Sequence, residues 1–261
     1  MVVTEKNRRL ECFIAQTDEM IIEAQKLRYH IFAEEMGAQL QSGADKLDHD
    51  EYDPYCDHLI VFDRVHQKIA GYTRLLPQHQ AERLGRFYSQ SEFDLGQILQ
   101  LPGKFLEIGR TCVHPEYRGG IVLSALWSYL MQQYVQKGGF NYLMGCASIP
   151  AGPHGFSVDA VYRSIAPNNF SPENVQARPL HPVPENLRNA QDECGIPPLL
   201  KAYLRFGVWV CGQPSYDPDF NVMDLFILLP INGIPERYTN HYVKPATLPQ
   251  TQYDLTLALG V

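Results

Sequence analysis

The sequence predicts an α/β (α+β) fold, in which a mixed central sheet is flanked by helices within a single domain over residues 1–261. Apolar residues recur at helical spacing in some segments and form short strand-like runs in others. Helical and strand-like segments alternate along the chain, which is typical of an α/β domain. With 45% hydrophobic and 20% charged residues, the 261-residue chain can bury one large core or at most two small ones.

The N-terminal segments are expected to form a helix, a loop and a hairpin. Residues 19–36 carry apolar side chains three and four positions apart, which predicts a helix. Residues 38–57 are acidic and loop-like. HLIVFD (58–63) and IAGYTRLLP (69–77) flank a polar turn and therefore predict a β-hairpin.

The middle of the chain predicts a strand, a helix and another strand. Residues 78–104 are mixed in character, with one helix expected near 89–100. FLEIGRTCV (105–113) predicts a strand, and IVLSALWSYLMQQYVQK (121–137) predicts an apolar helix that ends at two glycines. NYLMGCASI (141–149) predicts a further strand.

The character of the chain changes at about residue 150. Nine prolines in residues 150–198 predict an irregular but ordered insertion. LLKAYLRFG (199–207) predicts a short helix, and residues 208–212 and 221–230 predict a second hairpin. The residues from about 231 onward are expected to form a C-terminal tail packed on the surface.

Composition argues against several functions. A net charge of −7 argues against non-specific nucleic-acid binding. The N-terminus lacks the apolar stretch of a secretory signal, and no run of about 18 apolar residues could span a membrane. We therefore expect a cytoplasmic protein. The six cysteines are scattered without a CxxC pair, so we expect reduced thiols and no metal site.

The stretch LEIGRTCVHPEYRGG (106–120) combines a charged strand with a glycine-containing turn. The first N–H groups of the helix that follows have no intrahelical partners, and the helix dipole is positive there. Gly119 and Gly120 would let a phosphate approach this backbone. A glycine pair before a helix also occurs as a plain turn, so both interpretations stay open.

Glu107 and Arg110 present a problem of phase, because residues three apart in a regular strand face opposite sides. A β-bulge at Gly109 would rephase the strand and bring both side chains to one site. Arg74 alternates with Tyr72 and would join them.

Arg28 is expected on the apolar stripe of its helix, next to Ile31 and Phe32. A buried guanidinium needs an anionic partner. Glu107 and a substrate carboxylate are the candidates.

Several motifs occur in the order of one branch of the GNAT N-acyltransferases, which the chain resembles over roughly residues 20–240. They include LRYHIFAEEMG, DKLDHDEYDPYCDHLIVFD, GYTRLLP, FYSQSEFDL, LEIGRTCVHPEYRGG and GCASIP. That branch contains the ornithine-acyl-[acyl-carrier-protein] N-acyltransferases and proteins labelled putative hemolysins. The resemblance implies a GNAT acyl-CoA N-acyltransferase-like fold.

The resemblance also implies a donor site. In GNAT proteins the pattern [Q/R]-x-x-G-x-[G/A] holds the pyrophosphate of acyl-CoA, which assigns Val113, Arg118, Gly119 and Gly120 to the phosphopantetheine arm. YRGGIVLSALW is one residue short of this pattern. A shortened loop suits the single phosphate of acyl carrier protein (ACP), although acyl-CoA stays possible. No permanently bound cofactor is expected.

The chain also resembles, more distantly, the acyl-homoserine-lactone synthases. The tryptophan that usually follows the first helix in those enzymes is absent here. The pattern they share with this chain implies substrate-binding and catalytic positions. The substrate-binding positions are Arg28, Phe32, Asp48, Asp53 and Arg74, and the catalytic positions are Glu107 and Arg110.

Amide formation requires a neutral amine, so a base must deprotonate the ammonium that arrives. Glu107 is the first candidate, directly or through water, and its alternative role is an ion pair that fixes the fold. A cysteine nucleophile is not expected, because Cys112 and Cys146 have no paired histidine.

The expected activity is transfer of a (3-hydroxy)fatty acyl group from ACP to the α-amino group of an amino acid, ornithine by resemblance. ACP would dock on a local basic patch, and contact with a membrane surface is possible because the product is a lipid. The alternatives are a synthase of acyl-homoserine lactones or other N-acyl amino acids, and a non-catalytic lipid- or carrier-binding protein.

Overall fold

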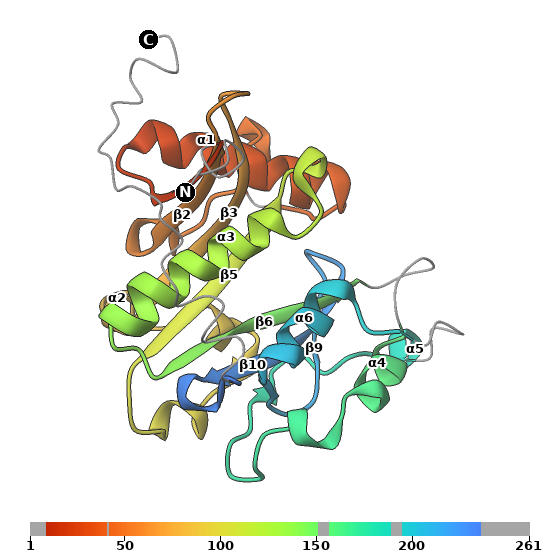
Figure 1. Ribbon diagram of the computed structural model, residues 1–261. Helices are drawn as coiled ribbons and strands as arrows, with labels where there is room; N and C mark the ends of the chain where they lie inside the picture. The colour runs from red at the N-terminus through yellow and green to blue at the C-terminus, as the bar shows by residue number, and fades with distance from the viewer. Residues whose placement is uncertain (1–8, 41, 151–156, 189–194, 236–261) are drawn as a thin grey trace.

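The computed structural model describes residues 9–40, 42–150, 157–188 and 195–235 (Figure 1). Its centre is an eight-stranded sheet in the order β1-β2-β3-β5-β6-β10-β8, with β9 paired to β10. Neighbouring strands are antiparallel except β5 and β6, which are parallel, so the predicted mixed α/β sheet is confirmed. The strands are β1 (Leu10–Ile14), β2 (Asp57–Asp63), β3 (Lys68–Pro77), β5 (Phe105–Val113), β6 (Tyr142–Pro150), β8 (Trp209–Val210), β9 (Ser215–Asp217) and β10 (Val222–Pro230).

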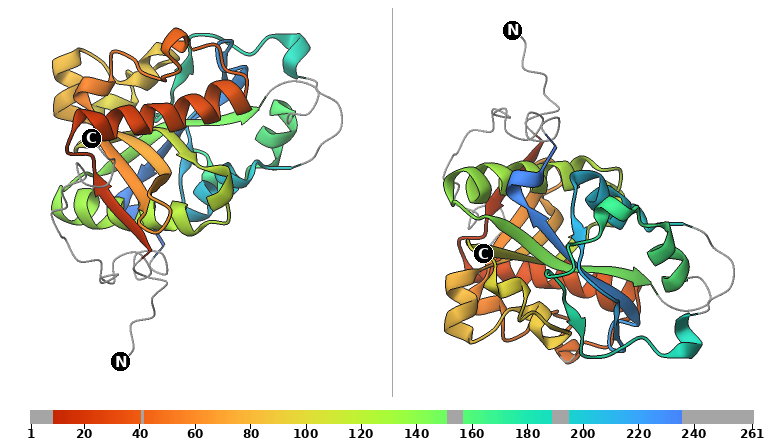
Figure 2. Two further views of the ribbon diagram at one scale, coloured as in Figure 1. Left: turned by 90° about the horizontal axis from the view of Figure 1, so that it is seen from above. Right: turned by 90° about the horizontal axis from the view of Figure 1, so that it is seen from below.

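Helices cover both faces of this sheet (Figure 2). α1 packs on one face, and α3 packs on the other face together with α6. In the part of the chain that the structure describes, no helix is both long and apolar enough to cross a bilayer. The helices are α1 (Asp18–Tyr29), α2 (Gln78–Leu84), α3 (Ile121–Leu130), α4 (Val158–Ser164), α5 (Glu185–Arg188) and α6 (Pro198–Phe206), and α1 and α3 continue as the π-helical turns η2 (His30–Glu35) and η8 (Met131–Lys137).

Alternation along β2 explains this layering. Ile60 and Phe62 pack against α1, whereas Leu59 and Val61 belong to the core under α3. Side chains two residues apart share a face of a strand, so one strand supplies both cores. At the start of α1 the Thr17 hydroxyl accepts a hydrogen bond from the N–H of Met20 and so caps the helix.

The predicted helix near 89–100 is wrong. The chain forms α2 earlier, and then the 3₁₀ turn η5 (Tyr88–Ser91), the short strand β4 (Phe93–Asp94) and the 3₁₀ turn η6 (Ile98–Gln100). β4 pairs with β7 (Arg178–Pro179), which lies within the proline-rich insertion. Tertiary pairing therefore overrides local propensity here.

The insertion contains ordered elements in the residues that are described. α4, α5 and β7 fall within 150–198, and Val158 and Val161 are fully buried in the main core. The predicted tail from about 231 begins with the 3₁₀ turn η10 (Ile231–Gly233), and its residues 236–261 lie outside the described part. The single-domain assignment stays a prediction.

The parallel strands β5 and β6 separate partway along their length (Figure 1). They pair only from Phe105 opposite Tyr142 to Glu107 opposite Met144. Next to the last pair, a Cβ atom on Gly145 would lie 2.4 Å from the Ile108 carbonyl oxygen, so only glycine fits. Beyond this point the two strands are no longer paired, and we call this splayed region of the sheet the fork.

Candidate active site

A β-bulge in β5 places Glu107 and Arg110 on the same face. Tyr72 pairs with Cys112 and Arg74 pairs with Gly109, so β5 has one residue more than β3 between these two pairs. Arg110 takes the left-handed conformation, with φ of +52°. As a result Ile108 packs toward α3 and Cys112 packs toward α1, although both are even-numbered. The predicted rephasing is confirmed, with Arg110 and not Gly109 in the unusual conformation.

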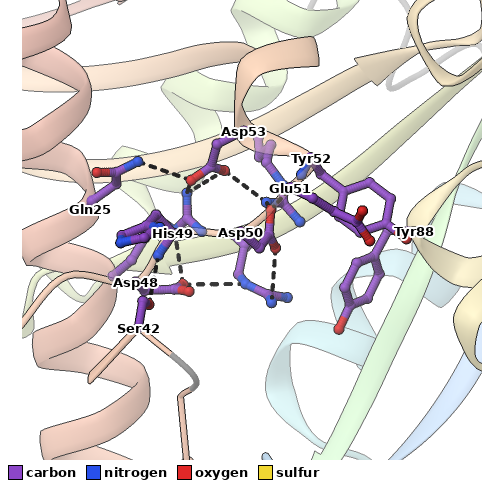
Figure 3. Close-up of polar contacts among 12 residues, drawn as sticks. Gln25, Ser42, Asp48, His49, Asp50, Glu51, Tyr52, Asp53 and Tyr88 are labelled. Atoms are coloured by element: carbon purple, nitrogen blue, oxygen red, sulfur yellow. Dashed lines mark hydrogen bonds and ion pairs between the residues drawn. The ribbon is translucent and has the colours of Figure 1, made fainter. Parts of the chain in front are cut away.

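Three arginines and three aspartates form a closed ring of alternating charge on this face. Four of its six contacts join atoms 2.6–2.9 Å apart, and the two contacts that Arg110 makes are 3.2 Å and 3.5 Å long. Figure 3 shows the three aspartates, which come from one loop. In order around the ring, the residues are Arg28, Asp53, Arg74, Asp50, Arg110 and Asp48.

The ring corrects the expected partner of Arg28. Its guanidinium, fully buried, pairs with Asp48 and Asp53, and the structure gives it no contact with Glu107. Burial alone would raise the pKa of Asp53, but the charges of Arg28 and Arg74 outweigh burial and lower that pKa to about 2. The ring therefore ties the acidic loop to α1 and to the sheet.

Glu107 sits at the root of the fork and holds the start of η5. Its carboxylate accepts hydrogen bonds from the N–H of Tyr88 at 2.6 Å and from the N–H of Ser89 at 2.7 Å. The Ser89 hydroxyl donates a third, at 2.5 Å. Burial raises the pKa of Glu107, and these hydrogen bonds oppose the rise.

Arg110 is held between two aromatic rings. Its guanidinium carbon lies 4.9 Å from the ring centroid of Tyr88 and 4.8 Å from that of Phe220. Phe32, on η2, meets Phe220 edge to face and so reaches the site indirectly. The side chain of Arg110 is 12% exposed, against 0% for Arg28 and 3% for Arg74. Arg110 is therefore the most accessible cation of the ring.

Sequence reasoning missed Tyr88, Ser89 and Phe220. Tyr88 and Ser89 lie in FYSQSEFDL, and an aromatic pair beside polar residues in a mixed segment was the available signal. Phe220 lies in the turn between β9 and β10, far from Arg110 in the sequence.

The predicted phosphate-binding turn opens to the surface. Gly120 is the N-cap of α3 with φ of +92°, and a Cβ atom on Gly119 or Gly120 would meet nothing within 4 Å. Val113 pairs with Gly71 at the end of β5. Arg118 forms an exposed ion pair with Glu35 at 2.6 Å.

A narrow pocket lies on the α3 side of the fork. Its lining is mainly apolar, with a hydroxyl from β5, and includes Ile108, Thr111, Leu126, Trp127, Leu130 and Tyr203. Its free space is about the size of one water molecule, so it is a gap in the packing beside the separated strands and not a preformed site for an acyl chain.

A second acidic group, also missed by sequence reasoning, lies near Arg110. Glu92, Asp217 and Asp224 each place one carboxylate oxygen within 4.8 Å of the others, a spacing that could hold a metal ion. Glu92 lies far from Asp217 and Asp224 in the sequence, so no local ligand spacing indicates the group. The expectation of no metal site stays a prediction.

The described cysteines have no activating partner. Cys12, Cys56, Cys112, Cys146 and Cys211 are free thiols. Burial raises the pKa of Cys112 to about 12 and raises that of Cys146 well above its ordinary value. Both remain protonated thiols near neutral pH, which argues against an acyl-cysteine intermediate.

Comparison with known proteins agrees with this architecture. The family described as "Acetyltransferase (GNAT) domain" matches residues 27–128. An L-ornithine N(alpha)-acyltransferase of Rhizobium meliloti is 37% identical over 89% of this chain and 84% of its own length. Proteins of the same name from Brucella abortus and Rhodobacter capsulatus are 35% and 32% identical, over 88% and 95% of their lengths.

Two solved structures share the fold. The CoA-dependent acyl-homoserine lactone synthase BjaI, bound to SAM and isopentyl-CoA, has a TM-score of 0.56 at 14% identity, over 97% of each chain. FeeM, an N-acyl amino acid synthase from uncultured soil microbes, has a TM-score of 0.51 at 11% identity, over 86% of this chain and 92% of its own. The forked sheet, together with relatives that match over most of their length, identifies the chain as a GNAT-fold acyltransferase of the L-ornithine N(alpha)-acyltransferase family.

Proposed function

We propose that this enzyme transfers a (3-hydroxy)fatty acyl group from the phosphopantetheine thioester of ACP to the α-amino group of L-ornithine, in ornithine lipid biosynthesis. The observation that carries the proposal is the fork between β5 and β6, which has Glu107 at its root and Arg110 on the same face. The names of the relatives narrow the acceptor to ornithine.

The donor would enter from the open turn before α3. Val113, Arg118, Gly119 and Gly120 would hold the phosphate of the arm at the N-terminus of α3. The thioester would then lie in the fork, and the acyl chain would have to widen the narrow gap beside Trp127 on the α3 side. ACP would dock near Arg118, because the net charge of −7 leaves only local basic patches for an acidic carrier.

The acceptor would lie on the α1 face of the fork. Arg110 would contact the α-carboxylate of the amino acid, since it is the most accessible guanidinium of the ring. We assign Arg28, Asp48, Asp53 and Arg74 to positioning Arg110, and Phe32 to holding Phe220 against it.

Proton transfer would pass through Ser89. Both carboxylate oxygens of Glu107 already accept hydrogen bonds, so the amine proton would reach Glu107 through the Ser89 hydroxyl. The neutral amine attacks the thioester carbonyl and forms a tetrahedral oxyanion. Collapse of this intermediate breaks the C–S bond and releases the pantetheine thiolate, and the proton that the attacking nitrogen loses as the amide forms is taken up by the thiolate.

The test is an assay with paired donors and a panel of amines. A 3-hydroxyacyl-ACP and the matching acyl-CoA are each incubated with ornithine, other amino acids and S-adenosylmethionine, and the products are analysed by mass spectrometry. We expect N(α)-acylornithine, formed faster from the ACP thioester. An acyl-homoserine lactone would identify a signal synthase, and no amide from any amine would support a binding protein.

A further inference from the structure

Three carboxylates meet beside the fork, on the face that carries Glu107. Glu92 follows η5, Asp217 ends β9, and Asp224 lies on β10 opposite Ser148 of β6. The three carboxylate oxygens lie within 4.8 Å of one another. We call these residues the acidic triad.

The acidic triad is short of positive charge. Asp224 accepts a hydrogen bond from the Ser148 hydroxyl at 2.7 Å, and Asp217 accepts hydrogen bonds from the N–H groups of Asp219 and Phe220. Glu92 is 6% exposed and interacts with Asp224 through its side chain, while its Oε2 atom is buried without a hydrogen-bond partner. Against the rise that burial causes, Arg110 lowers the pKa of both Glu92 and Asp224, but Asp48 and Asp50 already share its charge. Such a site favours a cationic ligand.

The acidic triad is placed where an acceptor would reach it. The Ser89 hydroxyl lies 3.4 Å from the sulfur of Cys146, and Ser148 is two residues further along β6. Two strand residues span about 7 Å. Five single bonds separate the two nitrogens of ornithine, which is about 6 Å when extended. Ser148 is exposed, so the triad lies next to solvent at the open end of the fork.

We infer that the acidic triad binds the side-chain ammonium of a diamino-acid acceptor and thereby sets both the choice of acceptor and the position of acylation. This inference rests on the proposed function and adds residues to it. With the side-chain nitrogen held protonated among carboxylates, only the α-amine can lose a proton near Ser89 and act as the nucleophile. The acceptor would then be held by its carboxylate at Arg110 and by its side chain at the triad.

The test compares two acceptors that differ only in the terminal ammonium group. Ornithine and norvaline are assayed with the wild-type enzyme and with Glu92→Gln and Asp224→Asn. In the wild type we expect the KM for norvaline to be at least about tenfold higher than that for ornithine. Each variant should raise the KM for ornithine by at least about tenfold, leave norvaline nearly unchanged, and yield some side-chain-acylated product.

Glu173→Gln is the matched control, because Glu173 is an exposed carboxylate of the insertion. It should keep the wild-type preference for ornithine. Thermal unfolding with ornithine or norvaline measures binding without turnover, since a ligand that binds the native state raises the melting temperature. If Asp224→Asn does not fold, Glu92→Gln alone decides the test.

Several outcomes overturn the inference. Equal use of ornithine and norvaline by the wild type would do so, as would a parallel change of both KM values in the variants. Activity that requires a divalent cation and loses this requirement in Glu92→Gln would mean that the triad holds a metal ion. Failure of the wild type to acylate any amine would instead overturn the proposed function.

Discussion

Glu107 Oε2 accepts a hydrogen bond from the backbone N–H of Tyr88 at 2.6 Å, which ties the root of the fork to η5. Tyr88 in turn lies against Arg110, so this carboxylate also positions the cation of the proposed acceptor site. A glutamine at this position would direct an amide NH₂ group at a backbone N–H or at the Ser89 hydroxyl. Glu107→Gln is therefore expected to disturb these hydrogen bonds as well as remove the carboxylate.

We expect Glu107→Gln to lower kcat by about 100-fold or more and the free energy of unfolding by about 1–3 kcal/mol. Ser89→Ala separates these effects, because it keeps both backbone donors paired with Glu107. It should lower kcat with a smaller loss of stability. Steady-state kinetics and urea unfolding measure the two quantities, and wild-type kcat in Glu107→Gln would remove Glu107 as the base.

Asp53→Asn should strongly destabilise the fold, because Asp53 bridges Arg28 and Arg74 inside the ring. Loss of one member of a buried pair costs about 3–5 kcal/mol. Because the pKa of Asp53 is lowered in the folded protein, its carboxylate stabilises the fold fully at pH values above the ordinary aspartate pKa near 4. This stabilisation is lost as the pH falls toward about 2. Urea unfolding measures the change, and Lys26→Gln, which breaks an exposed pair with Glu23, should change nothing measurable. Equal stability of both variants would contradict the ring's structural role.

Gly145→Ala should distort the fork, since its Cβ atom would lie 2.4 Å from the carbonyl oxygen of Ile108. We expect a loss of about 1–3 kcal/mol in unfolding free energy, as in other overpacked sites. Gly109→Ala is the control for stability, because its Cβ atom would meet nothing within 4 Å. If both variants unfold at the same denaturant concentration, the close approach at Gly145 is not a constraint.

Glu92→Gln should raise the melting temperature at pH 8 and have less effect at pH 5. Burial is the largest cause of the raised pKa of Glu92, and repulsion from Asp224 and Asp217 raises it further. A carboxyl with a raised pKa in the native state contributes stability at low pH and loses it as pH rises. One kcal/mol corresponds to about 2–4 °C in a protein of this size. Calorimetry at the two pH values measures the difference, and a larger gain at pH 5 would contradict the assignment.

Arg118→Ala should raise the KM for acyl-ACP several-fold with little change in kcat, if Arg118 meets the phosphate of the arm. Arg118 and its ion-pair partner Glu35 are both exposed, so the guanidinium can be reached from solvent. Lys26→Ala, at an exposed position on α1, is the charge-matched control. The same KM for acyl-ACP in both variants would place the phosphate elsewhere.

The sequence by itself determined most of the sheet and helices, because their apolar periodicity is a local property. It also predicted that the strand carrying Glu107 and Arg110 is rephased, since two charged residues three apart cannot otherwise share a face. It failed for residues 89–100, where pairing between β4 and β7 outweighs local preference. Strand β1 was missed as well, and it is held by pairing with β2.

Only the tertiary structure decided which charges meet. Arg28 needs an anion on physical grounds, but the sequence near it offers no way to choose between Glu107 and the aspartates of a loop. The path of that loop over the sheet selects Asp48 and Asp53. The acidic triad likewise joins three distant segments, and proximity between such segments is a property of the folded chain and not of any local pattern.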